Sequence, residues 1–109
     1  MKCLLLALVL AISPSLATAE SLKLREGMLY SEARALILGD GWVGAKPGNT
    51  SDRCIGREDV CSKWPEAKDC SGTGLGYCEF VFQRGKSELS VVTAGELPED
   101  IHVESWKAD

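Results

Sequence analysis

The residues with the clearest chemical potential are four cysteines in the middle of the chain, Cys54, Cys61, Cys70 and Cys78. Cysteines form disulfides in oxidising compartments, bind metals, or act as nucleophiles. Structural zinc sites usually contain closely spaced ligand pairs such as CxxC, whereas the intervals here contain six, eight and seven residues. The spacing therefore predicts two disulfides and no metal site.

The pairing of these cysteines is not fixed by their number, because four cysteines can pair in three ways. Short loops favour Cys54–Cys61 and Cys70–Cys78, and the two other pairings stay open at this stage. Each bond would contribute roughly 2–4 kcal/mol, chiefly by restricting the unfolded chain. A chain this short has a small core, so such cross-links would matter for its stability.

A second candidate for chemistry is His102, the one histidine of the chain, with Asp100 and Glu104 nearby in the sequence. An imidazole oriented by a carboxylate is the general base of many hydrolases. No GxSxG element supplies a nucleophilic serine, and oxidised cysteines offer no thiolate. We therefore expect no catalytic residue and no cofactor, and we keep a small hydrolase using His102 as an alternative.

The first 19 residues have the pattern of a secretory signal peptide. Lys2 gives the positive start, residues 4–12 the short apolar run, and residues 17–19 (Ala-Thr-Ala) the cleavage site. The apolar run is too short to cross a bilayer, so we expect no membrane insertion. The prediction is a signal peptide at residues 1–19, one small domain at residues 20–109, and a periplasmic or secreted product.

The net charge narrows the class of partner. Without Lys2 the chain has 11 basic and 16 acidic residues, a formal charge of −5. Nucleic acids and anionic membranes attract clusters of Lys and Arg, so we expect neither as a partner. An acidic chain is compatible with a basic protein partner.

The first half of the chain contains one clear helix signal. Residues 30–38 (YSEARALIL) have apolar side chains at helical spacing, with Ser31 as the expected N-cap and Gly39-Asp40-Gly41 as the end. Residues 42–45 predict a short strand. Residues 52–76 carry most of the cysteines, and their apolar residues do not recur at helix or strand spacing. This predicts an irregular stapled loop with a helical turn at residues 65–68.

The C-terminal third predicts antiparallel strands. Residues 77–83 (YCEFVFQ) and 88–93 (ELSVVT) are rich in aromatic and β-branched side chains, and residues 84–87 between them have the length of a hairpin loop. Cys78, Phe80 and Phe82 share one face, which we assign to the core. Residues 101–106 alternate again, with Ile101 and Val103 on one face and His102, Glu104 and Trp106 on the other. The prediction is an α+β domain with one N-terminal helix on an antiparallel sheet of three or four strands and a disulfide-stapled central loop.

The stapled loop, taken from Arg53 to Tyr77, is also the predicted binding surface. Binding residues gather on loops held by a rigid scaffold, and a preformed loop loses less entropy on binding. Trp64 has few apolar neighbours in the sequence, so we expect its side chain to be exposed. Together with Arg57, Lys63 and Tyr77 it forms the predicted set of anchors for a partner protein.

Two segments carry a resemblance to known proteins. Residues 27–42 (GMLYSEARALILGDGW), followed by residues 70–74 (CSGTG) and Cys78, resemble uncharacterised small exported bacterial proteins of the periplasm. Gly27-Met28 before a capped helix more remotely resembles β-lactamase-inhibitor-protein-like and BamE-like (SmpA/OmlA) domains. This resemblance implies a helical layer on an antiparallel sheet and binding to other envelope or secreted proteins.

These observations predict an exported, non-enzymatic domain that binds another exported or envelope protein. Inhibition, immunity and envelope assembly are the variants of this function that stay open. A hydrolase using His102 and a structural envelope component without a discrete ligand are the alternatives.

Overall fold

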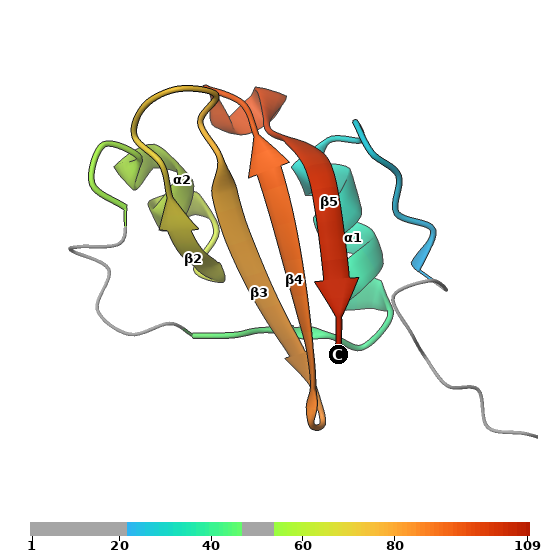
Figure 1. Cartoon of the computed structure of the whole chain (residues 1–109). Helices are drawn as coiled ribbons and strands as arrows, with labels where there is room; N and C mark the ends of the chain where they lie inside the picture. Colours follow the sequence, from blue (N-terminus) through green and yellow to red (C-terminus); the bar gives the residue numbers. More distant parts are fainter. Residues whose placement is uncertain (1–21, 47–53) are drawn as a thin grey trace, which may run out of the picture.

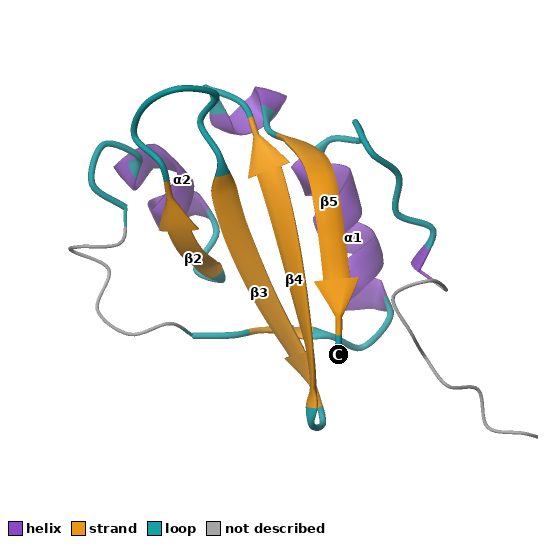
Figure 2. Cartoon of the chain, viewed as in Figure 1, coloured by secondary structure: helices purple, strands orange, loops and turns teal. Residues whose placement is uncertain are grey.

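The computed structural model describes residues 22–46 and 54–109, so the predicted signal peptide lies outside the described residues. Along the described residues the elements follow in the order α1 (Tyr30–Gly39), β1 (Val43–Gly44), α2 (Glu58–Lys63), β2 (Ala67–Cys70), β3 (Cys78–Arg84), β4 (Ser87–Ala94), the 3-10 helix η2 (Pro98–Asp100) and β5 (His102–Ala108). The strands form one antiparallel sheet, and α1 lies against one of its faces (Figures 1 and 2). The predicted α+β class is confirmed.

Strand β3 organises the sheet. On one edge it pairs with β2 near its start and with β1 near its end, and on the other edge it pairs with β4. The sheet has five strands because the short β1 and β2 share one edge of β3. The predicted hairpin is confirmed, with a turn of two residues between Arg84 and Ser87. Cys78, Phe80 and Phe82 are buried on the face that packs against α1, as predicted.

Helix α1 begins at Tyr30, so the prediction of Ser31 as its N-cap is wrong. Leu29 holds the cap position and makes no side-chain cap hydrogen bond. The segment before the helix instead pairs with the start of β5: Gly27 N donates to Val103 O (2.7 Å), and Tyr30 N donates to Ile101 O (2.8 Å). Pairing with β5 therefore fixes the entry to α1, and no hydroxyl cap is needed.

An aromatic cluster under the sheet contains Trp64, whose expected exposure is wrong. Trp64 is 4% exposed. Its ring meets the ring of Tyr30 edge-on, with centroids 4.9 Å apart, and Tyr30 stacks on Phe80 at 3.9 Å. The apolar neighbours of Trp64 come from α1 and β3, which are distant in the sequence and become visible only in the fold.

A buried carboxylate lies beside this cluster. Glu66 is 2% exposed and accepts hydrogen bonds from the Tyr30 hydroxyl (2.6 Å) and from Arg34 Nε (2.6 Å), both at Oε2. Arg34 Nη2 also donates to Glu66 Oε1 (3.2 Å). A buried carboxylate is tolerated only where its charge is paired and its oxygens are hydrogen-bonded, and here both conditions are met. This network ties α1 to the turn before β2.

The same network makes the stability of the fold sensitive to alkali. Burial and the adjacent Glu66 carboxylate raise the pKa of the Tyr30 hydroxyl far above its usual value. Above about pH 10 the unfolded chain loses this proton while the folded chain keeps it. We expect this tyrosine to lower the free energy of unfolding by about 1.4 kcal/mol per pH unit in that range.

The measurement is urea denaturation at intervals between pH 9 and pH 12, on the wild type and on Tyr30→Phe. The two proteins differ only at this hydroxyl, so the difference between the two slopes isolates Tyr30. Parallel pH dependences for the two proteins would contradict this prediction.

The segment of residues 65–70 differs from its predicted structure. The helical turn expected at residues 65–68 is wrong, because the helix lies at Glu58–Lys63 and residues 67–70 form β2. Pairing with β3 decides this segment, which has little strand propensity of its own.

In β5, Val103 is opposite Thr93 but Ser105 is opposite Val92, so Glu104 is an extra residue in a β-bulge. The bulge turns Trp106 to the face of Val91, where it packs against the core. The prediction that Trp106 shares a face with His102 is therefore wrong.

Within residues 22–46 and 54–109, none of the helices has the length and apolar character required to cross a membrane.

Candidate binding surface

The two disulfides are those that the sequence favours, Cys54–Cys61 and Cys70–Cys78. The first ties the loop before α2 to that helix, with Cα atoms 6.3 Å apart. The second joins directly opposite residues of β2 and β3, with Cα atoms 4.0 Å apart, and closes the loop of residues 71–77. The loop before α2 and the loop of residues 71–77 are therefore both covalently fixed.

A buried arginine fixes the same region without covalent bonds. Arg57 is 6% exposed, and its guanidinium donates to the carbonyl oxygens of Gly95 (3.2 Å) and Glu96 (3.1 Å), with Gly76 O at 3.5 Å. Its Nε lies 3.5 Å from an Asp59 carboxylate oxygen. Arg57 thus joins the loop before α2 to two other loops, and its donors serve the fold. It is not the exposed anchor that the sequence suggested.

We call the three joined loops, residues 54–57, 71–77 and 95–97, the loop end. They lie together where β2 and β4 end and β3 and β5 begin (Figure 1). Gly95 N donates to Leu75 O (3.0 Å). A Cβ atom on Gly72 would lie 3.2 Å from Ile55 O, so these two loops are also in close contact.

Gly76 marks the tightest contact within the loop end. A Cβ atom there would lie 2.5 Å from Gly95 O and 2.9 Å from Arg57 Nη1, and the residue has a positive φ of 68°. Gly74 offers a matched comparison, because its φ is 71° but a Cβ atom would meet nothing within 4 Å.

Alanine at either glycine is expected to cost about 1–2 kcal/mol for the left-handed backbone. Gly76→Ala should cost a further 1–3 kcal/mol or so, because it forces two backbones apart. Urea denaturation of the two variants measures this difference. Equal losses for Gly74→Ala and Gly76→Ala would show that the loops are not in contact at this point.

The loop end exposes four large apolar side chains. Ile55 is 65% exposed, Leu75 64%, Leu97 51% and Tyr77 44%. They come from all three loops, so the fold brings together residues from distant parts of the sequence. Exposed apolar side chains that gather on rigid loops are typical of protein interaction sites.

Exposed carboxylates occur within the loop end and directly beside it in the sequence. Exposed acidic residues occur at the start of α2 and from the end of β4 to η2, namely Glu58, Asp59, Glu96, Glu99 and Asp100. Arg57 is the one basic residue within residues 54–59, 71–77 and 95–100. Asp59 and Glu96 both line a depression of about 530 Å³ between the loops, which Arg57 and the glycines of residues 72–76 also line. The loop end therefore carries exposed apolar side chains together with these five carboxylates, which we call the acidic border.

The four predicted anchors are separated by the structure. Trp64 and Arg57 are buried, whereas Lys63 and Tyr77 are exposed. The contribution of Lys63 and Tyr77 to binding stays a prediction. Ile55, Leu75 and Leu97 are not among the predicted anchors. The sequence does contain a signal for Ile55 and Leu75, because each is an apolar residue beside glycine in a segment without helical or strand periodicity. Such a residue belongs to no apolar face that would bury it.

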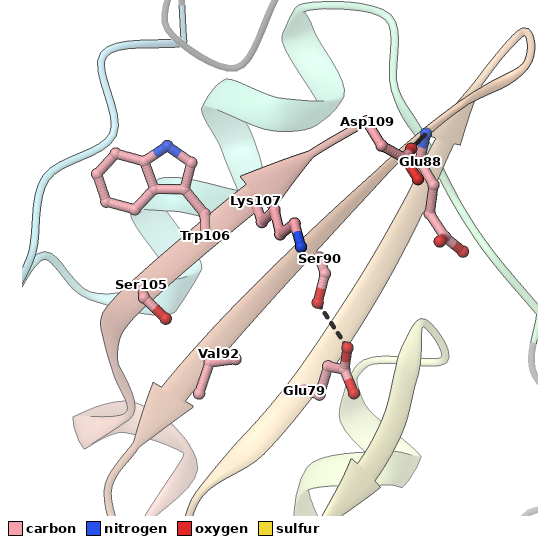
Figure 3. A pocket seen from close by; sticks show the side chains of 8 residues that line it. All are labelled: Glu79, Glu88, Ser90, Val92, Ser105, Trp106, Lys107 and Asp109. Atoms are coloured by element: carbon pink, nitrogen blue, oxygen red, sulfur yellow. Dashed lines mark hydrogen bonds between the residues drawn. The ribbon is translucent and has the colours of Figure 1, made fainter.

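The outer face of the sheet is a second exposed surface, shown in Figure 3. It forms a depression of about 370 Å³ lined mainly by polar side chains. Ser90 Oγ donates to Glu79 Oε2 (2.6 Å), while the indole of Trp106 lies off the edge of β5 and away from this pair. Because its lining is mainly polar and Ser90 and Glu79 already bond with each other, this face offers fewer apolar anchors for a partner than the loop end does.

His102 pairs with an acid, as the hydrolase alternative requires. Its Nε2 lies 3.2 Å from Glu104 Oε2, and its Nδ1 lies 3.2 Å from the carbonyl oxygen of Asp100. The His102 side chain is 40% exposed. In the part of the chain that the structure describes, no hydroxyl or thiol group is within hydrogen-bonding distance of the ring. The described residues therefore place no side-chain nucleophile beside the His102–Glu104 pair.

Comparisons with known proteins assign no family or function to this surface. No protein-family model matches the chain, and searches of curated proteins and of solved structures found no similar protein.

Proposed function

We propose that this protein is an exported, non-enzymatic domain that binds another protein through its loop end. The observation that carries the proposal is the exposure of Ile55, Leu75, Leu97 and Tyr77 on loops that two disulfides and Arg57 hold in place. Large apolar side chains supply most of the energy of protein interfaces. Loops that are already ordered lose little entropy when they bind. Export is supported by the signal-peptide pattern and by the two disulfides.

The acidic border indicates the kind of partner. We expect a protein with an apolar patch flanked by Lys and Arg side chains, because these would face Asp59, Glu96 and the neighbouring carboxylates. Charges at the rim of an interface act mainly on the rate of association and on specificity. The apolar centre would then supply the affinity, and the border would supply orientation.

The effect of one leucine tests this proposal. Leu75→Ala is expected to weaken binding of the partner at least tenfold, because it removes one of the two most exposed large apolar side chains of the loop end. The disulfide-intact protein, immobilised, captures the partner from an envelope extract, and the affinity of the purified partner is then measured for each variant.

Leu38→Ala is the matched control, since Leu38 is an exposed leucine on α1, away from the loop end. It should bind as the wild type does, and both variants should keep the wild-type melting temperature. A partner that binds Leu75→Ala as tightly as the wild type, or loses affinity only with Leu38→Ala, would refute the loop end as the binding surface.

A further inference from the structure

The sulfur atoms of the two disulfides gather in one cluster. The Sγ atoms of Cys54, Cys61 and Cys70 all lie within 4.8 Å of one another, and Sγ of Cys78 is bonded to that of Cys70. The four sulfurs come from the loop before α2, from α2 itself and from two paired strands. Their intervals in the sequence gave no metal-site pattern, because strand pairing and the position of α2 bring them together.

The surroundings of the cluster are apolar and largely closed to water. Cys54, Cys61 and Cys78 are buried members of the hydrophobic core, and Cys70 is half-buried and packs against it. A reductant can therefore approach through Cys70, while the rest of the cluster stays shielded. Burial of this kind protects a metal–thiolate site from competing ligands.

We propose that this cluster becomes a tetrathiolate Zn²⁺ site when both disulfides are reduced. A dithiol reductant supplies two electrons and two protons to each disulfide and is itself oxidised, which gives four thiols. Zn²⁺ then replaces the four thiol protons, which are released to solvent.

The geometry of the cluster is close to what such a site needs. A tetrahedral Zn²⁺ with Zn–S bonds of about 2.3 Å holds its sulfurs about 3.8 Å apart. The Cys70 sulfur lies within 4.8 Å of the sulfurs of Cys54 and Cys61, so these sulfurs must approach by about 1 Å at most. The Cys78 sulfur is bonded to that of Cys70 and would turn from it to take the fourth position. Metal binding and the disulfides exclude each other, so the redox state decides which one stabilises the stapled segment. This inference is independent of the proposed binding function.

The test uses the protein without residues 1–19, fully reduced with a phosphine and kept free of oxygen. Titration with Co²⁺ should give a thiolate-to-cobalt charge-transfer band and the visible bands of tetrahedral Co²⁺, saturating at one equivalent. Addition of Zn²⁺ should abolish both. The oxidised protein should show neither band.

The double variant Cys54→Ser/Cys61→Ser keeps one cysteine pair and is expected to bind Co²⁺ at least a hundredfold more weakly. Because the reduced chain has lost its cross-links, far-UV circular dichroism of the same samples reports whether the metal restores the fold. The proposal would be overturned by saturation at another stoichiometry, by equal affinity in the double variant, or by tight binding that leaves the chain unfolded.

Discussion

Replacing Trp64 with alanine is expected to lower the free energy of unfolding by about 3–5 kcal/mol. The side chain is 4% exposed and packs edge-on against Tyr30 and Phe80, so its removal leaves a cavity that these rigid rings cannot fill. Urea denaturation followed by far-UV circular dichroism measures the loss. Binding through the loop end should change only as far as the fold is lost.

Trp106→Ala is the control for this experiment. That tryptophan is half-buried at the edge of β5, so its removal should cost clearly less than the removal of Trp64. Trp64→Phe, which keeps an aromatic ring in the cluster, should recover part of the stability. A loss below about 1 kcal/mol for Trp64→Ala would contradict its place in the core and return it to the candidate binding residues.

Glu66→Ala is expected to cost about 3 kcal/mol. It leaves the buried Tyr30 hydroxyl without its acceptor and removes the partner of Arg34. We expect the lower end of the range for a broken buried ion pair, because the Arg34 side chain is about one-third exposed and can turn to water. The measurement is again urea denaturation, at pH 7.

Glu79→Ala provides the comparison, since Glu79 also accepts a short hydrogen bond, from Ser90, but on the half-buried outer face of the sheet. Its removal should cost less than about 1 kcal/mol, because water can replace the lost bond. Similar losses for the two variants would mean that the Glu66 network contributes no more than a surface contact.

Much of the fold could be predicted from local patterns. The hairpin between β3 and β4 needs only two alternating segments and a short loop with glycine, and all of these are adjacent in the sequence. The disulfides follow from loop length in the same way. Helix α1 was found from its apolar spacing, and only its first residue was misplaced, because its entry is fixed by pairing with β5.

The features that could not be predicted depend on contacts between distant segments. Residues 67–70 become a strand because β3 offers them hydrogen bonds and a cysteine partner. The bulge at Glu104 reverses the faces of β5, and the alternation of residues 101–106 gives no sign of it.

The candidate site was found in part. The stapled segment supplies two of the three loops of the loop end. The sequence predicts Arg57 and Trp64 as anchors there, with Trp64 exposed because it has few apolar neighbours in the sequence. Both side chains are buried. Arg57 donates to the carbonyl oxygens of Gly76, Gly95 and Glu96, and Trp64 packs between α1 and β3. Leu97 belongs to a loop some twenty residues beyond the stapled segment, and contacts of that loop with Arg57 and Leu75 bring it to the site.

Site-specific photocrosslinking in intact source cells would test the proposed binding surface most directly. A photoreactive amino acid at position 75 should form an adduct with one partner protein, and the same probe at position 38 on α1 should form none. In envelope extracts the yield from position 75 should fall as salt is raised, because the acidic border guides association. Adducts from position 38 alone, or none from position 75, would contradict the proposal that the loop end binds a protein.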